Sequence, residues 1–156
     1  MLPYTVLIDT LENAPQLVVG LVREAPVEIL KLRPAPGEWS IHESACHLAS
    51  VHPLFFHRLE LMLSENHPTI KPYNPGVDDA EDALLAMDLE GCLAQFVSER
   101  ERLVRRLKEL APQDWERSAA HPEYARYSVF IMFRHLLLHD QMHAYHIEEL
   151  VLKPNW

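Results

Sequence analysis

The chain has 156 residues, of which 48% are hydrophobic and 24% charged, so it is long enough for one domain with a sizeable core. Its net charge of −9 argues against a nucleic-acid partner, because nucleic-acid binding needs a cationic surface. No segment has the form of a signal peptide or approaches the ~20 apolar residues of a membrane span. We therefore expect a single soluble domain over residues 1–156, located in the cytoplasm.

The two cysteines, Cys46 and Cys92, have no CxxC spacing and are expected to be buried small hydrophobic residues rather than a disulfide. With only 4 glycines, the composition favours helices over a turn-rich β structure.

The first predicted helix contains apolar residues that recur at helical spacing from Leu7 onward, and it ends near Glu24. Pro15 must be absorbed, either as a kink or as the first residue of the main helical run. Pro26 ends this run, and residues 30–38 are predicted to form a loop because they contain further prolines and a glycine.

The second predicted helix begins at a capping box, in which the Ser40 hydroxyl and the Glu43 carboxylate each cap a backbone N–H at the helix start. Trp39 precedes the cap and can pack against the first turn. The helix is expected to run from Ser40 to about Asn66, although Pro53 removes a donor and bends the axis, which leaves its continuity open.

The rest of the chain supplies two further long helices. Residues 67–78 are expected to form a proline-rich loop, and residues 80–87 a short helical piece. Asp88 can cap a third long helix that Pro112 stops, and a fourth is expected over residues 128–151. Four amphipathic helices in one chain predict an all-α four-helix bundle.

A basic cluster occupies the third helix and alternates with glutamates, a pattern typical of a solvated helix face rather than of a phosphate-binding track. Its members are Arg100, Arg102, Arg105, Arg106 and Lys108.

Four histidines lie on the fourth predicted helix: His135, His139, His143 and His146. Residues four apart differ by roughly 40° around a helix axis, so the first three of them follow one face. That face also carries apolar residues, Met132, Leu136, Ile147 and Leu150, so it should point toward the core.

Histidines at i and i+4, as in His139 and His143, are a recurrent half of a metal site in helical bundles, and neutral imidazole is a good ligand for divalent metals. Buried core histidines without a metal are the alternative. His47 is the best third ligand, because it lies on the apolar stripe of the second helix. The remaining histidines lie at a cap, off that stripe or in loops: His42, His52, His57, His67 and His121.

Two segments carry a resemblance to a known family. Residues 39–48 resemble the W-S-x-x-E-x-x-x-H-L element of the DinB-like superfamily, and residues 139–147 are similar to its H-D-x-x-H-x-x-Q-I element. The resemblance implies a bundle of up-down-down-up topology and one divalent metal ion bound by His47, His139 and His143. His146 stands where the family usually has Gln, so it could be a fourth ligand, a substrate contact or a residue that orients the ligands.

Three neutral histidines would leave an open coordination position for water or a substrate thiolate, which is typical of a catalytic site. Zinc or nickel suits such ligands. The family resemblance implies a metal-dependent enzyme acting on a small molecule, either a small-thiol S-transferase or a hydrolase, and a homodimer. A metal-binding or stress-response module without turnover is the alternative.

Three further residues are candidates for roles beside the metal. His135 and His146 are expected to line the pocket or orient the ligands. Arg58, on the same stripe as His47, either anchors an anionic substrate group or lies at the surface as an ordinary arginine.

Overall fold

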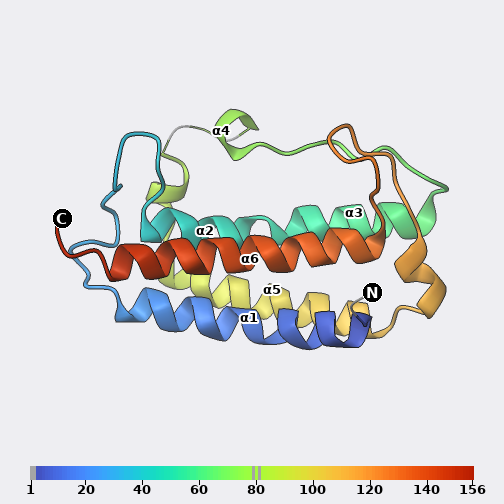
Figure 1. Ribbon diagram of the computed structural model, residues 1–156, viewed down its shortest axis with the longest axis horizontal. Coiled ribbons are helices and arrows are strands. Elements are labelled where there is room, and N and C mark those ends of the chain that lie inside the picture. The colour runs from blue at the N-terminus through green and yellow to red at the C-terminus, as the bar shows by residue number, and fades with distance from the viewer. Residues whose placement is uncertain (1–2, 79, 81) are drawn as a thin grey trace.

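The computed structural model describes residues 3–78, 80 and 82–156, and these form a bundle of long helices with two connecting segments folded over one side (Figure 1). The helical elements are α1 (Tyr4–Glu24), α2 (Ile41–Ser50), α3 (His52–Ser64), α4 (Pro75–Asp78), η1 (Leu84–Ala86), α5 (Leu89–Lys108), η2 (Pro112–Glu116) and α6 (Val129–Val151). The only β pairing among the described residues is two isolated bridges between loops. The predicted all-α four-helix bundle is confirmed.

The topology of the bundle is up-down-down-up, as expected. In Figure 1, α1 and α6 run in one direction, while the α2–α3 pair and α5 run in the other. The chain between α3 and α5 must therefore cross the whole length of the bundle before α5 begins. This crossing segment and the loop that precedes α6 are joined by the bridge between Thr69 and Ala120, and together they cover one side of the bundle.

The helix expected from Ser40 to about Asn66, whose continuity past Pro53 was left open, is divided in the structure. The structure has two helices that meet at Val51, because Pro53 has no N–H with which to continue the α-helical hydrogen-bond ladder. Val51 keeps right-handed helical angles, and its N–H donates to the carbonyl of His47, so α2 and α3 lie end to end (Figure 1). Residues at helical spacing on α2 and α3 therefore lie on one continuous face.

The predicted loop and short helix before α5 also need correction. The expected loop at residues 67–78 contains the single helical turn α4, and the expected helix over residues 80–87 is reduced to the 3₁₀ turn η1. Residues 79 and 81, which fall in or beside these predictions, lie outside the described residues. Prolines spaced along this segment favour turns over longer helices.

The predicted helix starts are confirmed by their caps. The Ser40 hydroxyl accepts from the Glu43 N–H at 3.2 Å, and the Glu43 carboxylate accepts from the Ser40 N–H at 2.9 Å. Asp88 and Ser128 cap α5 and α6 in the same way, each accepting from the backbone N–H three residues on. Pro15 lies buried within α1, which absorbs it.

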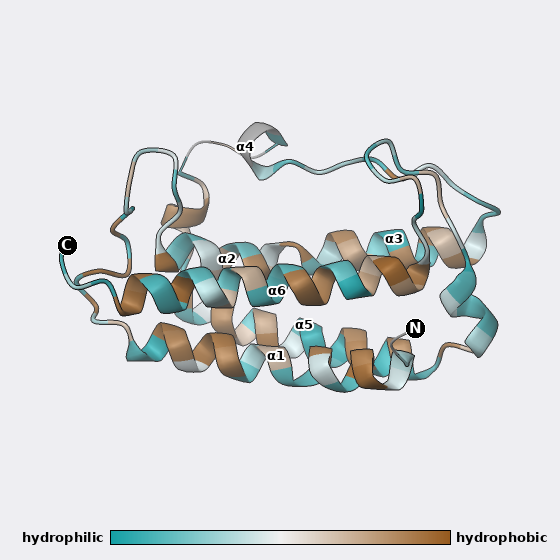
Figure 2. Ribbon diagram, viewed as in Figure 1, coloured by the Kyte–Doolittle hydropathy of each residue, from teal (hydrophilic) through white to brown (hydrophobic). Residues whose placement is uncertain are grey.

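Each long helix carries both apolar and polar residues (Figure 2). None of the described helices is long and apolar enough to cross a membrane. The buried apolar side chains form two clusters, one toward each end of the bundle. On α6 the first cluster ends at Leu137 and the second resumes at Ala144; on α5 they are separated between Phe96 and Leu103. Polar side chains occupy the layer between the two clusters, and the candidate site lies there.

Candidate metal centre

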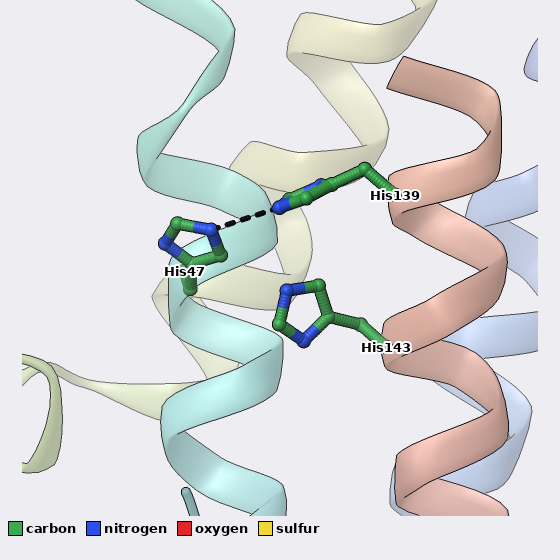
Figure 3. A group of neighbouring side chains, drawn as sticks. All are labelled: His47, His139 and His143. Carbon is green, nitrogen blue, oxygen red and sulfur yellow. Dashed lines mark hydrogen bonds between the residues drawn. The ribbon is translucent and has the colours of Figure 1, made fainter. Parts of the chain in front are cut away.

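Three histidines meet where α2 lies beside α6. His47 comes from α2, and His139 and His143 come from successive turns of α6 (Figure 3). The Nε2 atoms of His47 and His139 are 3.0 Å apart, and one nitrogen from each of the three rings lies within 4.8 Å of the others. The structure therefore brings together the three histidines that the sequence singled out, from positions 92 residues apart in the chain.

Burial makes all three rings poor bases. The pKa of His47 is lowered to about 3, that of His139 to about 4 and that of His143 to about 3. Desolvation is the largest cause in each case, and neighbouring histidines, with Arg100 near His139, add to it. The rings are therefore neutral at physiological pH. Neutral imidazole is the form that binds a metal ion, so the donor set fits a divalent cation in both spacing and protonation.

Trp39 packs against two of these rings, tilted to the His47 ring and stacked on the His143 ring. Its ring centroid lies 4.7 Å from that of His47 and 5.7 Å from that of His143, with the His143 ring nearly parallel. The Nδ1 atoms of His47 and His139 are buried without a hydrogen-bond partner among the described residues. Aromatic packing thus takes over part of the orienting role that hydrogen bonds usually play at ligating histidines.

His146 lies next to the group but is not one of the three. Its Nε2 is 2.8 Å from the carbonyl oxygen of Trp39, so the ring ties Trp39 to α6. Of the alternatives for His146, the geometry favours a residue that orients the ligands, acting through Trp39. His135, one turn before His139, is exposed in the wall of the adjoining cavity.

The other histidines have other surroundings. The Nε2 of His42 lies 3.1 Å from the Leu84 carbonyl oxygen, and the Nδ1 of His67 lies 2.9 Å from the Ser118 hydroxyl. His57 is exposed on α3. His121 was set aside as a loop residue, but it lines the cavity beside the three histidines.

A cavity of about 460 Å³ adjoins the histidine group. One wall is the shared face of α2 and α3, and another is α6. The crossing segment and the loop before α6 line its outer side, and the cavity is open to solvent. It is lined by Trp39, His47, Val51, Leu54, Phe55, Arg58, Pro72, Tyr73, Pro75, His121, Glu123, Tyr124, Tyr127, His135, His139, Met142 and His143. The volume is that of a small-molecule site.

Arg58 is a buried residue of this cavity rather than a surface arginine. Its side chain is 8% exposed, and one terminal nitrogen donates to the Lys71 carbonyl at 2.7 Å. The sequence left the two readings of Arg58 open, because spacing on the stripe does not reveal that the crossing segment folds over it.

The prediction that Arg100 belongs to a solvated basic face was wrong. Its side chain is 1% exposed, and Nη1 lies 2.7 Å from the Asp140 carboxylate, which is equally buried. Nε donates to His52 at 3.1 Å. The ion pair lies in the polar layer and joins α5 to α6, where Asp140 directly follows the candidate ligand His139. Arg102 and Arg106, by contrast, form exposed or half-buried ion pairs, as expected of the basic cluster.

The fold and the histidine cluster define a class: four-helix bundles with the up-down-down-up topology and a candidate three-histidine metal site. The sequence profile of the DinB superfamily matches residues 10–147, and the chain belongs to this superfamily.

Named relatives agree with this assignment. A protein of Oceanobacillus iheyensis named "Putative metal-dependent hydrolase" is 30% identical, over 96% of this chain and 86% of its own. A Bacillus cereus protein of the same name is 26% identical over the same shares. Among solved structures, YfiT from Bacillus subtilis, described as a probable metal-dependent hydrolase with an unusual four-helix bundle topology, superposes with a TM-score of 0.83 at 26% identity, over 94% of this chain and 84% of that one.

Proposed function

We propose that the chain binds one divalent metal ion through His47, His139 and His143 and hydrolyses a small-molecule substrate that enters the adjoining cavity. The observation that carries the proposal is the group of three neutral, largely buried imidazoles whose nitrogens lie within 4.8 Å of one another. The names of the relatives support hydrolysis as the reaction class.

His47, His139 and His143 would hold the ion, and a divalent metal bound by three neutral histidines would activate water and polarise a carbonyl or phosphoryl oxygen. The chain's own residues prepare that site. Trp39 keeps the rings of His47 and His143 in place, and His146 holds Trp39. The apolar part of the cavity wall, including Val51, limits the water that reaches the substrate.

Zinc or nickel is the metal we propose, because both suit neutral nitrogen ligands. We also propose a cytoplasmic location, which is the expectation from the sequence, and a homodimer, which is what the family resemblance implies. Light scattering on the purified protein tests whether it is a dimer.

The test compares metal-free protein with protein reloaded with zinc, nickel, manganese or cobalt. Hydrolysis of 4-nitrophenyl esters should return with one of these metals and stay absent in His143→Ala. His57→Ala is the matched control, because His57 is exposed on α3 and belongs to no part of the site. Metal-dependent turnover that appears only when a low-molecular-weight thiol and an electrophile are supplied would identify S-transfer instead. Bound metal without turnover in either assay would favour the non-catalytic module.

A further inference from the structure

Within the proposed hydrolase site, on which this inference rests, we propose that Arg58 binds a carboxylate at the far end of the substrate. The cavity would then select elongated molecules that carry a carboxylate at one end and the bond to be hydrolysed at the other. The candidate ligands lie toward one end of the cavity and Arg58 toward the other.

The spacing follows from the helices. Arg58 is eleven residues after His47 on the end-to-end helices α2 and α3, a separation of roughly 16 Å along the axis at the rise of an α-helix. Helical side chains lean toward the N-terminus, so the Arg58 side chain leans back toward the histidines. The lining residues Val51 and Phe55 fill the interval between them on the same face. A substrate that contacts both ends must therefore be several bonds long.

Arg58 is built into the cavity wall as a cation without a counter-ion. It forms no ion pair with any carboxylate of the described residues, unlike the other buried arginine, Arg100, which pairs with Asp140. Its Nε is buried and has no hydrogen-bond partner among the described residues. A buried charge with an unused donor is costly unless a ligand completes its surroundings, and an anion does so.

The neighbours of Arg58 suit a carboxylate. The guanidinium carbon lies 5.9 Å from the centre of the Phe55 ring, which offers no competing acceptor. Burial raises the pKa of Tyr127, an effect opposed by the charge of Arg58 and by the hydrogen bond that Arg58 donates to the phenol oxygen. The phenol therefore stays protonated, and its own O–H can still donate to a ligand. Burial lowers the pKa of His121 below its usual value, so that ring adds no charge at neutral pH.

A single positive charge matches a monoanion better than a doubly charged phosphate. Glu123 also lines this cavity and adds a negative charge that disfavours a dianion. A guanidinium presents two parallel N–H donors, a geometry that matches the two oxygens of a carboxylate. The chemistry therefore favours a carboxylic acid over a phosphate ester.

The kinetic test uses two esters of equal chain length on the zinc-loaded enzyme: the mono-4-nitrophenyl ester of suberic acid, which ends in a carboxylate, and neutral 4-nitrophenyl octanoate. We expect at least a tenfold preference in kcat/KM for the charged ester, falling to about onefold in Arg58→Gln. Arg102→Gln is the matched control, because it removes an exposed arginine from α5 and should keep the preference. A preference that survives in Arg58→Gln would overturn the proposal.

A binding test separates this proposal from the proposed hydrolysis. Octanoate, measured by calorimetry on the zinc-loaded protein, should bind at least tenfold more tightly than octanamide, and Arg58→Gln should remove the difference even if no ester is ever hydrolysed. In the wild type, the NMR signal of the Arg58 Nε–H should move on addition of octanoate but not of octanamide, which tests the contact without a variant. An unmoved signal, or tighter Arg58-dependent binding of octyl phosphate than of octanoate, would contradict the carboxylate assignment.

Discussion

Among single residues, Trp39 has the clearest structural role in the site beyond the candidate ligands themselves. It packs at an angle against His47 and stacks on His143, and its carbonyl oxygen lies 2.8 Å from Nε2 of His146. The sequence predicted Trp39 only as a residue packing at the start of a helix. The W-S element of the family resemblance also contains Trp39, but a linear motif does not show which rings a tryptophan will contact.

Replacing Trp39 should therefore weaken metal binding although Trp39 is no ligand. We expect Trp39→Ala to lower the affinity for zinc by roughly 10- to 100-fold, the usual cost of losing a residue that orients metal ligands, and Trp39→Phe to lower it less. Competition with a chromophoric chelator measures both. Trp156→Ala, at the exposed C-terminus, is the control. Equal affinity in Trp39→Ala and the wild type would show that packing against Trp39 does not position the histidines.

His146→Gln tests whether His146 is itself a ligand. The Gln amide can donate to the Trp39 carbonyl as the ring nitrogen can, so zinc affinity should stay within about tenfold of the wild type. The same chelator competition gives the value. Loss of the metal in His146→Gln, with the helical circular dichroism intact, would make His146 a fourth ligand.

At the scale of elements, the sequence predicted the features that depend on residues close together in the chain. The caps at Ser40, Asp88 and Ser128 mark helix starts, because a hydroxyl or carboxylate there satisfies a free N–H within three residues. The sequence left the break at Val51 open, because a proline at position 53 is compatible both with a bend and with a new helix start. The histidine positions on α2 and α6 were predictable because helical periodicity places them on the inward faces.

Pairings between distant elements were not predictable in this way. Arg100 sits in a run of alternating charges that resembles a solvated face, and its partner Asp140 is on another helix. Nothing local distinguishes Arg100 from its exposed neighbour Arg102 except its place on the apolar stripe of α5. Burial of Arg58 likewise depends on a crossing segment that local signals do not position.

Arg100→Met should destabilise the bundle by about 3–5 kcal/mol, because it leaves the Asp140 carboxylate buried without its counter-ion. The free energy of unfolding in urea, measured on metal-free protein, tests this value. Arg100→Met combined with Asp140→Leu should recover part of the loss, since the double variant leaves no unpaired charge. A loss below about 1 kcal/mol in the single variant would mean that the pair does not stabilise the layer between the two clusters.

At the scale of the whole molecule, the two apolar clusters lead us to expect that the chain folds without a metal. Each draws residues from several helices, and burying one such side chain contributes roughly 1.5–3 kcal/mol before conformational entropy is subtracted. The polar layer between them interrupts the core without dividing it, because α1, α5 and α6 run through both clusters.

Removal of the metal should therefore leave the fold intact. After chelation we expect the helical circular dichroism to persist, with a melting temperature lower by about 5–10 °C than at a metal concentration 100 times Kd, where binding adds about 2.7 kcal/mol. A metal-free protein that is mostly unfolded at 25 °C would show instead that the metal is structural.

The central claim is that His47, His139 and His143 together hold one metal ion, and elemental analysis of purified protein tests it most directly. The wild type should contain about one equivalent of a divalent metal after dialysis against metal-free buffer. The variant with all three histidines replaced by alanine should contain less than about a tenth of that amount while keeping its helical circular dichroism. A triple variant that retained the metal as fully as the wild type would contradict the account.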